Sequence, residues 1–325
     1  MTLRNAKAPY LKKESSVSSM MRDTLLALAF LLVLPVVRYG VRPLAMAGAT
    51  LVVCALCEIA CSLIQSKTIN TADYSSMVTG LIIVMLMPLN APLWLPCTAS
   101  AFAVLVAKKP FGSTGYAPFN PAAAGVAFVT LLWPQQMFAY FNPEEAPVLP
   151  PFADCLVPTV PSPGAILQNG LKPAILPMDM LWGVFAGPVG TTAILVLCAC
   201  GLYLFLKGTI KWEITGFCLL AAALGAAFWP RIACAPLTSV KYELMAGSLL
   251  FCAMFMLTDP FTSPRTGLGR AIYGFLAGAL IILFRHYGVY EQGACFAILI
   301  ANAAVPHINS LVCGERKWGE ELYEE

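Results

Sequence analysis

Long apolar runs, separated by short polar or Gly- and Pro-rich segments, are the feature that most constrains this chain. Residues 44–64 and 292–311, for example, each approach the ~20 residues that an α-helix needs to cross the hydrocarbon core of a bilayer. Hydrophobic residues make up 59% of the sequence and charged residues 11%. A soluble domain could not cover so much apolar surface with so few charges. The sequence therefore predicts an all-α polytopic membrane protein.

The spacing of the apolar runs predicts ten transmembrane helices. They are expected at residues 24–41, 44–64, 74–89, 92–107, 121–138, 190–207, 214–229, 242–258, 271–286 and 292–311. Residues 1–23 form a basic N-terminal tail without a cleavable signal sequence, and residues 312–325 form a C-terminal tail. Placing both tails in the cytoplasm puts most lysines and arginines, Lys108 and Lys109 among them, on that side. The Pro-rich residues 139–189 are then an irregular external segment.

A short internal similarity divides the chain into two halves. Residues 79–92 and 246–260 share a glycine, an apolar run and a proline at similar spacing. They fall in the third and eighth predicted spans, and an offset of five spans reverses their direction in the membrane. We therefore predict two inverted five-helix repeats, residues 24–138 and 190–311, which would build a site near the midplane where the repeats meet. A coincidental pattern is the alternative interpretation.

The segment Gly187-Pro188-Val189-Gly190-Thr191-Thr192 comes directly before an apolar run. Its Gly and Pro residues break the approach, and the predicted helix then begins. Thr191 and Thr192 are expected in the first helical turn, where unpaired N–H groups and the helix dipole favour a phosphate group. The alternative is that a threonine only caps the helix.

A second irregular segment runs from Lys108 to Ala122 and enters a predicted helix at Asn120-Pro121. Its glycines allow tight turns, and Asn followed by Pro is typical of a helix start. This pattern favours a loop whose backbone approaches a flat ligand. A re-entrant connection satisfied within the protein is equally compatible with it.

Four acidic residues are expected in or near the membrane: Glu58, Asp73, Glu243 and Asp259. An ionisable group at that depth is costly and is therefore a functional candidate. The carboxylate of Asp259 and the carbonyl oxygens freed before Pro260 would suit a hard cation such as Na⁺. The alternative is that Asp259 belongs to an ordinary turn at a helix end.

Other classes of chemistry lack support in the sequence. Cys54, Cys57 and Cys61 share a helix face, but a metal site needs four ligands and neither histidine is near them, so packing roles are expected. There is no phosphate-binding loop of an ATPase, no nucleophile elbow, no HExxH and no nucleic-acid-binding motif. The sequence therefore argues against a hydrolase, an ATP-driven pump or a nucleic-acid partner.

The chain resembles the RnfD/NqrB family, the membrane subunits of ion-translocating electron-transport complexes, in four stretches: residues 79–94, 108–122, 187–193, and 254–264 running on to 291–309. Phe119-Asn120-Pro121-Ala122 resembles the family's FNPA, and Thr258–Pro264 resembles its TDPxTSP. Residues 187–193 align with its GSxGETS-like motif, and the resemblance covers roughly residues 24–311. It implies a subunit of a redox-driven translocase of the ferredoxin:NAD⁺ oxidoreductase type that couples electron flow to Na⁺ or H⁺ movement.

The resemblance also implies a covalent cofactor. In the family a threonine of the GSxGETS-like motif carries FMN through a phosphoester bond, and Thr192 falls on that position, with Gly187 and Gly190 keeping the glycines. Thr191 replaces the usual glutamate and becomes a rival acceptor, while Pro188 and Ala193 replace serines. A flavin transferase would attach the FMN during maturation.

Further expectations follow from the same resemblance. Noncovalent riboflavin would lie deeper in the bundle, with Asn120 and Pro121 as parts of its pocket. Asp259, Asp73 and Glu58 are the candidates for the ion pathway. The partners would be the subunits RnfA, RnfB, RnfC, RnfE and RnfG together with membrane lipid, in the inner cell membrane.

Two other functions fit the sequence. Inverted five-helix repeats would serve a small-solute channel or transporter without flavin equally well. A structural membrane scaffold that has lost its flavin is the third interpretation. Covalently bound flavin would distinguish the redox subunit from both the transporter and the scaffold.

Overall fold

The computed structural model describes residues 17–64, 74–111, 117–143, 149–152 and 157–313. Within these ranges the chain is helical, and the only β-type pairing is a single bridge between Phe141 and Thr159. The first half holds α1 (Val17–Tyr39), α2 (Arg42–Ile64), α3 (Ser75–Met85), α4 (Trp94–Phe102), η1 (Ala103–Lys108), η2 (Lys109–Phe111), α5 (Pro121–Leu132) and α6 (Pro134–Met137). The second half holds α7 (Pro163–Gln168), α8 (Pro177–Trp182), α9 (Ile194–Leu206), α10 (Trp212–Phe228), α11 (Pro236–Met245), α12 (Leu249–Phe251), η4 (Cys252–Met256), α13 (Gly267–Tyr287) and α14 (Ala294–Cys313).

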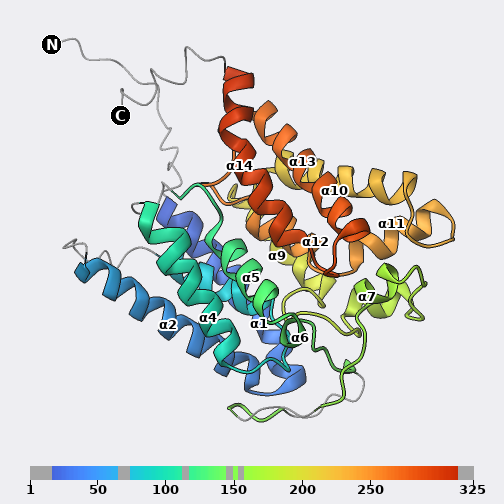
Figure 1. Ribbon diagram of the computed structural model, residues 1–325, viewed down its shortest axis with the longest axis horizontal. Coiled ribbons are helices and arrows are strands. Elements are labelled where there is room, and N and C mark those ends of the chain that lie inside the picture. The colour runs from blue at the N-terminus through green and yellow to red at the C-terminus, as the bar shows by residue number, and fades with distance from the viewer. Residues whose placement is uncertain (1–16, 65–73, 112–116, 144–148, 153–156, 314–325) are drawn as a thin grey trace.

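The helices form two bundles that lie side by side (Figure 1). The blue-to-green helices α1 to α6 make one bundle, and the orange-to-red helices α10 to α14 make the other. Contacts between α5 and α14 join them, and α9 packs against α1 of the first bundle. One continuous core of buried apolar side chains runs through both bundles.

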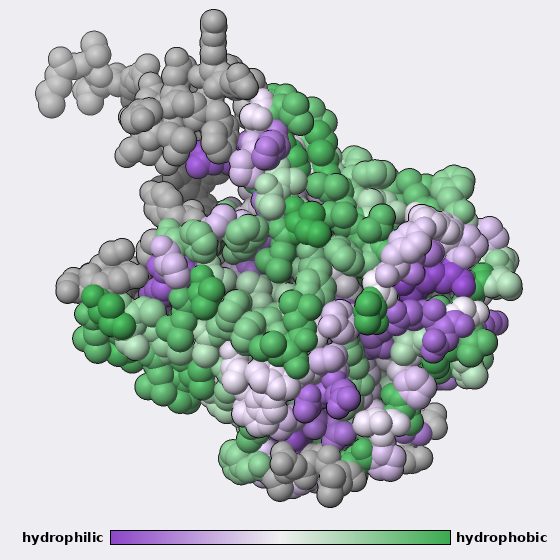
Figure 2. All heavy atoms as spheres, viewed as in Figure 1, coloured by the Kyte–Doolittle hydropathy of each residue, from purple (hydrophilic) through white to green (hydrophobic). Residues whose placement is uncertain are grey.

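The outer surface of the helices is apolar, as expected of a protein that lies in lipid. Phe30 and Val37 of α1 and Leu63 of α2 are exposed. Figure 2 shows apolar residues over most of one face, with polar residues gathered toward its lower and right-hand parts. The prediction of an all-α protein with several membrane spans is confirmed.

Helix length identifies some of the spans. Among the described residues, the helices α1, α2, α13 and α14 are long and apolar enough to cross a membrane. The number of such spans rises to five if the bent pair Pro236–Met245 and Leu249–Met256 is counted as one span. Four further apolar helices, α3, α5, α9 and α10, have 10–17 residues each. The ten-span arrangement with inverted repeats stays a prediction.

The continuous span predicted at 242–258 is wrong, because the helix breaks between α11 and α12. The two pieces are bent by 67°, and Gly247 lies between them with a φ of +70°, which favours glycine. Arg285 of α13 donates hydrogen bonds to the carbonyl oxygens of Glu243 and Ala246. The guanidinium thus replaces the helical partners that these carbonyl groups lose at the break.

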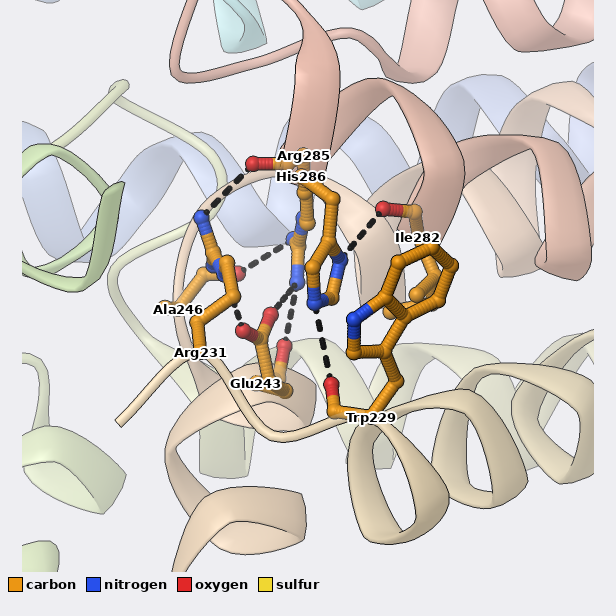
Figure 3. A network of polar contacts seen from close by, with 7 residues as sticks. All are labelled: Trp229, Arg231, Glu243, Ala246, Ile282, Arg285 and His286. Atoms are coloured by element: carbon orange, nitrogen blue, oxygen red, sulfur yellow. Dashed lines mark hydrogen bonds and ion pairs between the residues drawn. The ribbon is translucent and has the colours of Figure 1, made fainter. Parts of the chain in front are cut away.

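A buried ion-pair network surrounds this break (Figure 3). The carboxylate of Glu243 accepts hydrogen bonds from Arg231 at 2.5 Å and from Arg285 at 2.9 Å. Arg231 also donates to the carbonyl oxygen of Arg285. The network ties α11 and the segment after α10 to the end of α13.

The described parts of the 139–189 segment cover one end of the helices. Arg38, at the end of α1, donates to the carbonyl oxygens of Trp182 and Gly183. Gln168 of α7 donates to the carbonyl oxygen of Gly288, just after α13. The segment is therefore anchored on both halves of the chain, and we call it the cap.

Candidate cofactor and ion sites

The segment before α9 is held against the end of α3 by backbone hydrogen bonds. The N–H groups of Val189 and Gly190 donate to the carbonyl oxygens of Met87 and Met85, at 3.0 and 2.8 Å. Carbonyl groups at a helix C-terminus lack partners within the helix. A Cβ atom on Gly190 would lie 2.6 Å from that of Met85, so glycine is needed for this close approach. The first half of the chain thus positions the loop that carries the candidate threonine.

The expectation that Thr191 and Thr192 lie in the first turn of the helix is wrong, because α9 begins at Ile194. The loop backbone pairs with α3 instead, and the N–H of Thr191 donates to the carbonyl oxygen of Pro188 at 3.1 Å. Thr192 therefore lies two residues before the helix. No described side chain caps the start of α9.

The two threonine hydroxyl groups have different surroundings. Thr191 is 1% exposed, and its hydroxyl donates to the carbonyl oxygen of Pro188 at 3.3 Å. Thr192 is 9% exposed, and its hydroxyl makes no hydrogen bond to any described residue. A Cβ atom on Gly187 would lie 3.2 Å from the Thr192 methyl group, so a glycine there leaves room for Thr192.

Thr192 borders a cavity of about 300 Å³, its mouth included. Aromatic side chains form much of its wall: Tyr39, Tyr140, Phe141 and Phe185. The rings of Tyr39 and Phe141 meet edge to face at 5.3 Å. Thr192 thus presents a hydroxyl to a small hollow whose walls are largely aromatic.

Asn120 joins the two halves of the bundle. Its Oδ1 atom accepts hydrogen bonds from the N–H groups of Ala122 and Ala123, capping α5, which begins at Pro121. Its Nδ2 atom donates to the carbonyl oxygen of Met256, at the end of η4, at 3.0 Å. The predicted helix start is confirmed. The glycines of this loop, Gly112 and Gly115, lie outside the described residues.

A larger cavity lies where Asn120 meets the end of η4. It measures about 780 Å³ including its open mouth, and Pro121, Lys108, Thr258 and Asp259 also line it. The carboxylate of Asp259 accepts hydrogen bonds from the N–H of Phe261 at 3.3 Å and from the hydroxyl of Thr262 at 3.5 Å. Protein packed around this carboxyl group raises its pKa to about 6. Asp259 can therefore change charge near physiological pH.

Lys108 is a buried residue of this cavity, although the pattern of charges along the chain predicts only a cytoplasmic position for it. It is 4% exposed, and its ammonium group donates to the hydroxyls of Ser75 and Ser76, each at 2.6 Å. Its Nζ atom lies 3.6 Å from the carboxylate of Glu58, which Lys109 approaches to 3.1 Å. The sequence feature that could have indicated this burial is the position of Lys108 directly after an apolar run.

The structure thus places the predicted acids differently. Asp259 lines the large cavity, and Glu58 reaches it through Lys108. Glu243 belongs to the ion-pair network at the helix break. Asp73 lies outside the described residues. No group of three or more His, Cys, Asp and Glu side chains in the described ranges could hold a metal ion.

Comparison with known proteins identifies the family. The family model described as "NQR2, RnfD, RnfE family" matches residues 4–317. The chain belongs to this family. Within the NQR2, RnfD, RnfE family, the chain is similar to the D-type subunit of the Na⁺-translocating ferredoxin:NAD⁺ oxidoreductase complex of Acetobacterium woodii. The identity is 30%, over 99% of this chain and 96% of the relative.

A second relative is the D-type subunit of the ion-translocating oxidoreductase complex of Salmonella paratyphi A. It is 32% identical over 75% of this chain and 78% of its own length. In the present chain, the residues of the family motifs gather in two places. Asn120 and Asp259 share the large cavity, and Gly187 and Thr192 border the smaller, aromatic one.

Proposed function

We propose that this chain is a membrane subunit of a redox-driven, ion-translocating oxidoreductase complex and relays electrons through FMN attached to Thr192. The observation that carries the proposal is the family match over residues 4–317, together with relatives named as the D-type subunits of such complexes. The apolar exterior of the helices supports a position in the membrane.

The surroundings of the two threonines favour Thr192 as the attachment site. Its hydroxyl has no described partner and borders the aromatic cavity, whereas the Thr191 hydroxyl is buried and bonded within its own loop. The uncapped start of α9, two residues on, offers N–H groups toward a phosphate. Bound FMN would supply reversible electron transfer, and Tyr140, Phe141 and Phe185 would line its site.

The large cavity supports the second part of the proposal. Asn120 and Pro121 would hold noncovalent riboflavin, and Asp259, with the hydroxyl of Thr258, would bind the coupling Na⁺ or H⁺ at the cavity's edge. Lys108, close to both Glu58 and this cavity, would balance their negative charge.

The arrangement of the helices supports inverted five-helix repeats in this chain. The loop before α9 docks on the end of α3, and Asn120 before α5 docks on the end of η4. Each half thus supplies a loop to the corresponding helix of the other half. The tails would lie in the cytoplasm and the cap outside the inner cell membrane. RnfA, RnfB, RnfC, RnfE, RnfG, lipid and a flavin transferase would be its partners.

The test is the intact mass of the full chain co-expressed with a flavin transferase. Wild type should carry the added mass of FMN and fluoresce in a denaturing gel. Thr192→Val keeps the side-chain shape without the hydroxyl and should lose both signals, whereas the matched control Thr191→Val should keep them.

Two results would contradict the proposal. Mass that stays on Thr192→Val and leaves Thr191→Val would move the acceptor by one residue. A wild-type chain without FMN in the presence of a competent transferase would remove the covalent relay and favour a transporter or scaffold.

A further inference from the structure

A carboxyl group without a role in the proposed function lies buried between the cap and the loop before α14. Glu291 is 8% exposed, and its Oε2 atom accepts a hydrogen bond of 2.5 Å from the hydroxyl of Ser162. The hydroxyl of Tyr140 hydrogen-bonds to the same carboxyl group, and Gln292 donates to that hydroxyl at 2.9 Å. Burial raises the pKa of Glu291, and these hydrogen bonds only partly oppose the rise.

Few charged groups of the described residues face Glu291. The neighbouring helix α7 contains no ionisable residue, and the titratable groups of α14 are Cys295, Cys313 and, near its far end, His307. The basic groups at the end of α13 are engaged elsewhere. Arg285 binds Glu243, and the ring of His286 contacts the carbonyl oxygens of Ile282 and Trp229 (Figure 3).

Tyr140 connects this carboxyl group to the candidate cofactor site. Its ring lines the aromatic cavity that Thr192 borders, while its hydroxyl reaches Glu291. On the other side, Ser162 belongs to the cap, where its hydroxyl also accepts the N–H of Ala165. A row of polar groups therefore runs from the aromatic cavity through Glu291 to the cap.

Building on the proposed function, we propose that Glu291 takes up a proton when a flavin on Thr192 is reduced, acting through Tyr140 to compensate the added charge. The geometry assigns this role because the side chain is buried, forms no ion pair with the residues that the structure describes, and is joined by hydrogen bonds to the wall of the cofactor cavity. It is a positioning residue for charge and need not touch the cofactor.

The step balances in charge and atoms. One electron comes from the upstream redox centre of the complex, and its negative charge disfavours the ionised carboxylate nearby. Glu291 then takes one proton from water at the cap by way of Ser162, and an O–H bond forms on the carboxyl group. When the electron passes to the next carrier, that bond breaks and the proton returns to water.

The test uses the purified full chain after co-expression with a flavin transferase. Reduced-minus-oxidised infrared spectra should show a band of a protonated carboxyl group that shifts in heavy water. Glu291→Gln should lose this band, and the midpoint potential of its flavin should depend on pH with one proton fewer per reduced flavin. Asp179→Asn, which changes an acid of the cap outside the hydrogen-bonded row, is the matched control and should keep both properties.

The possible outcomes separate this inference from the proposed function. A flavin-loaded wild type without the carboxyl band, or an unchanged band and slope in Glu291→Gln, overturns the role of Glu291 and leaves the FMN site intact. A wild type without FMN overturns both. If Glu291→Gln fails to fold, Tyr140→Phe is the second test. A shift of the carboxyl band on loss of the tyrosine hydroxyl supports the assignment of that band to Glu291, and an unmoved band overturns it.

Discussion

At the scale of single residues, burial and hydrogen bonding distinguish groups that look alike in the sequence. Thr191 and Thr192 are adjacent, but only the hydroxyl of Thr191 is bonded within the loop. Among the acids, Glu243 lies between two arginines, whereas Asp259 contacts a backbone N–H and a hydroxyl. Asp259 is therefore the carboxyl group better placed to exchange a cation for a proton.

Binding of the coupling cation should depend on pH through Asp259. The carboxylate form attracts a cation and the protonated form does not, so with a pKa of about 6 binding is retained above that pH and lost as pH falls through it. Apparent Na⁺ affinity should fall about tenfold for each pH unit below 6. Equilibrium binding of radioactive Na⁺ to the purified complex measures this change.

The Asp259→Asn variant should bind Na⁺ weakly at every pH while its flavin content stays unchanged. Asp23→Asn, at the start of α1, is the control and should behave as wild type. Unaltered, pH-dependent binding in Asp259→Asn would remove this residue from the ion pathway.

At the scale of elements, polar groups decide where helices break. The α11–α12 break combines the positive φ of Gly247 with a guanidinium group that binds two freed carbonyl oxygens. The start of α9 is delayed because the loop backbone pairs with α3. In both places a contact distant in sequence overrides the local apolar pattern.

Glu243→Gln should strongly destabilise the α11–α12 break. It would leave Arg231 and Arg285 facing each other without a counter-charge, and removing one partner of a buried ion pair costs roughly 3–5 kcal/mol. Thermal unfolding of the detergent-solubilised chain measures the loss. Glu213→Gln is the control, because it removes a partly exposed ion pair in which the Glu213 carboxylate lies 3.8 Å from Arg270. It should lower the free energy of unfolding by at most about 1 kcal/mol. Equal losses of stability in the two variants would contradict this account.

At the scale of the whole molecule, the two ends of the bundle differ. The cap contacts Arg38 at the end of α1 and the loop that follows α13. Lys108, Lys109 and Glu58 lie together where η1 ends and α2 nears its last turn. The side of the membrane on which each end lies stays a prediction.

Labelling of single cysteines from either side of the membrane should find position 150 outside and position 109 inside the cell. The expected orientation follows from the excess of basic residues in the segments assigned to the cytoplasm. Protection of Pro150→Cys from an impermeant external reagent, with labelling of Lys109→Cys, would reverse the orientation and the side assigned to FMN.

The pattern of residues along the chain was sufficient to predict the all-α membrane class, because apolar runs with few charges have no other stable solution. It was also sufficient for the start of α5, since Asn120 and Pro121 act locally as cap and first residue. The broken helix, the late start of α9, the burial of Lys108 and the pairing of Tyr140 with Glu291 emerged only from the folded arrangement. Each depends on groups far apart in the chain, and local propensity carries no information about which distant hydrogen-bond partner a backbone or charged group will find.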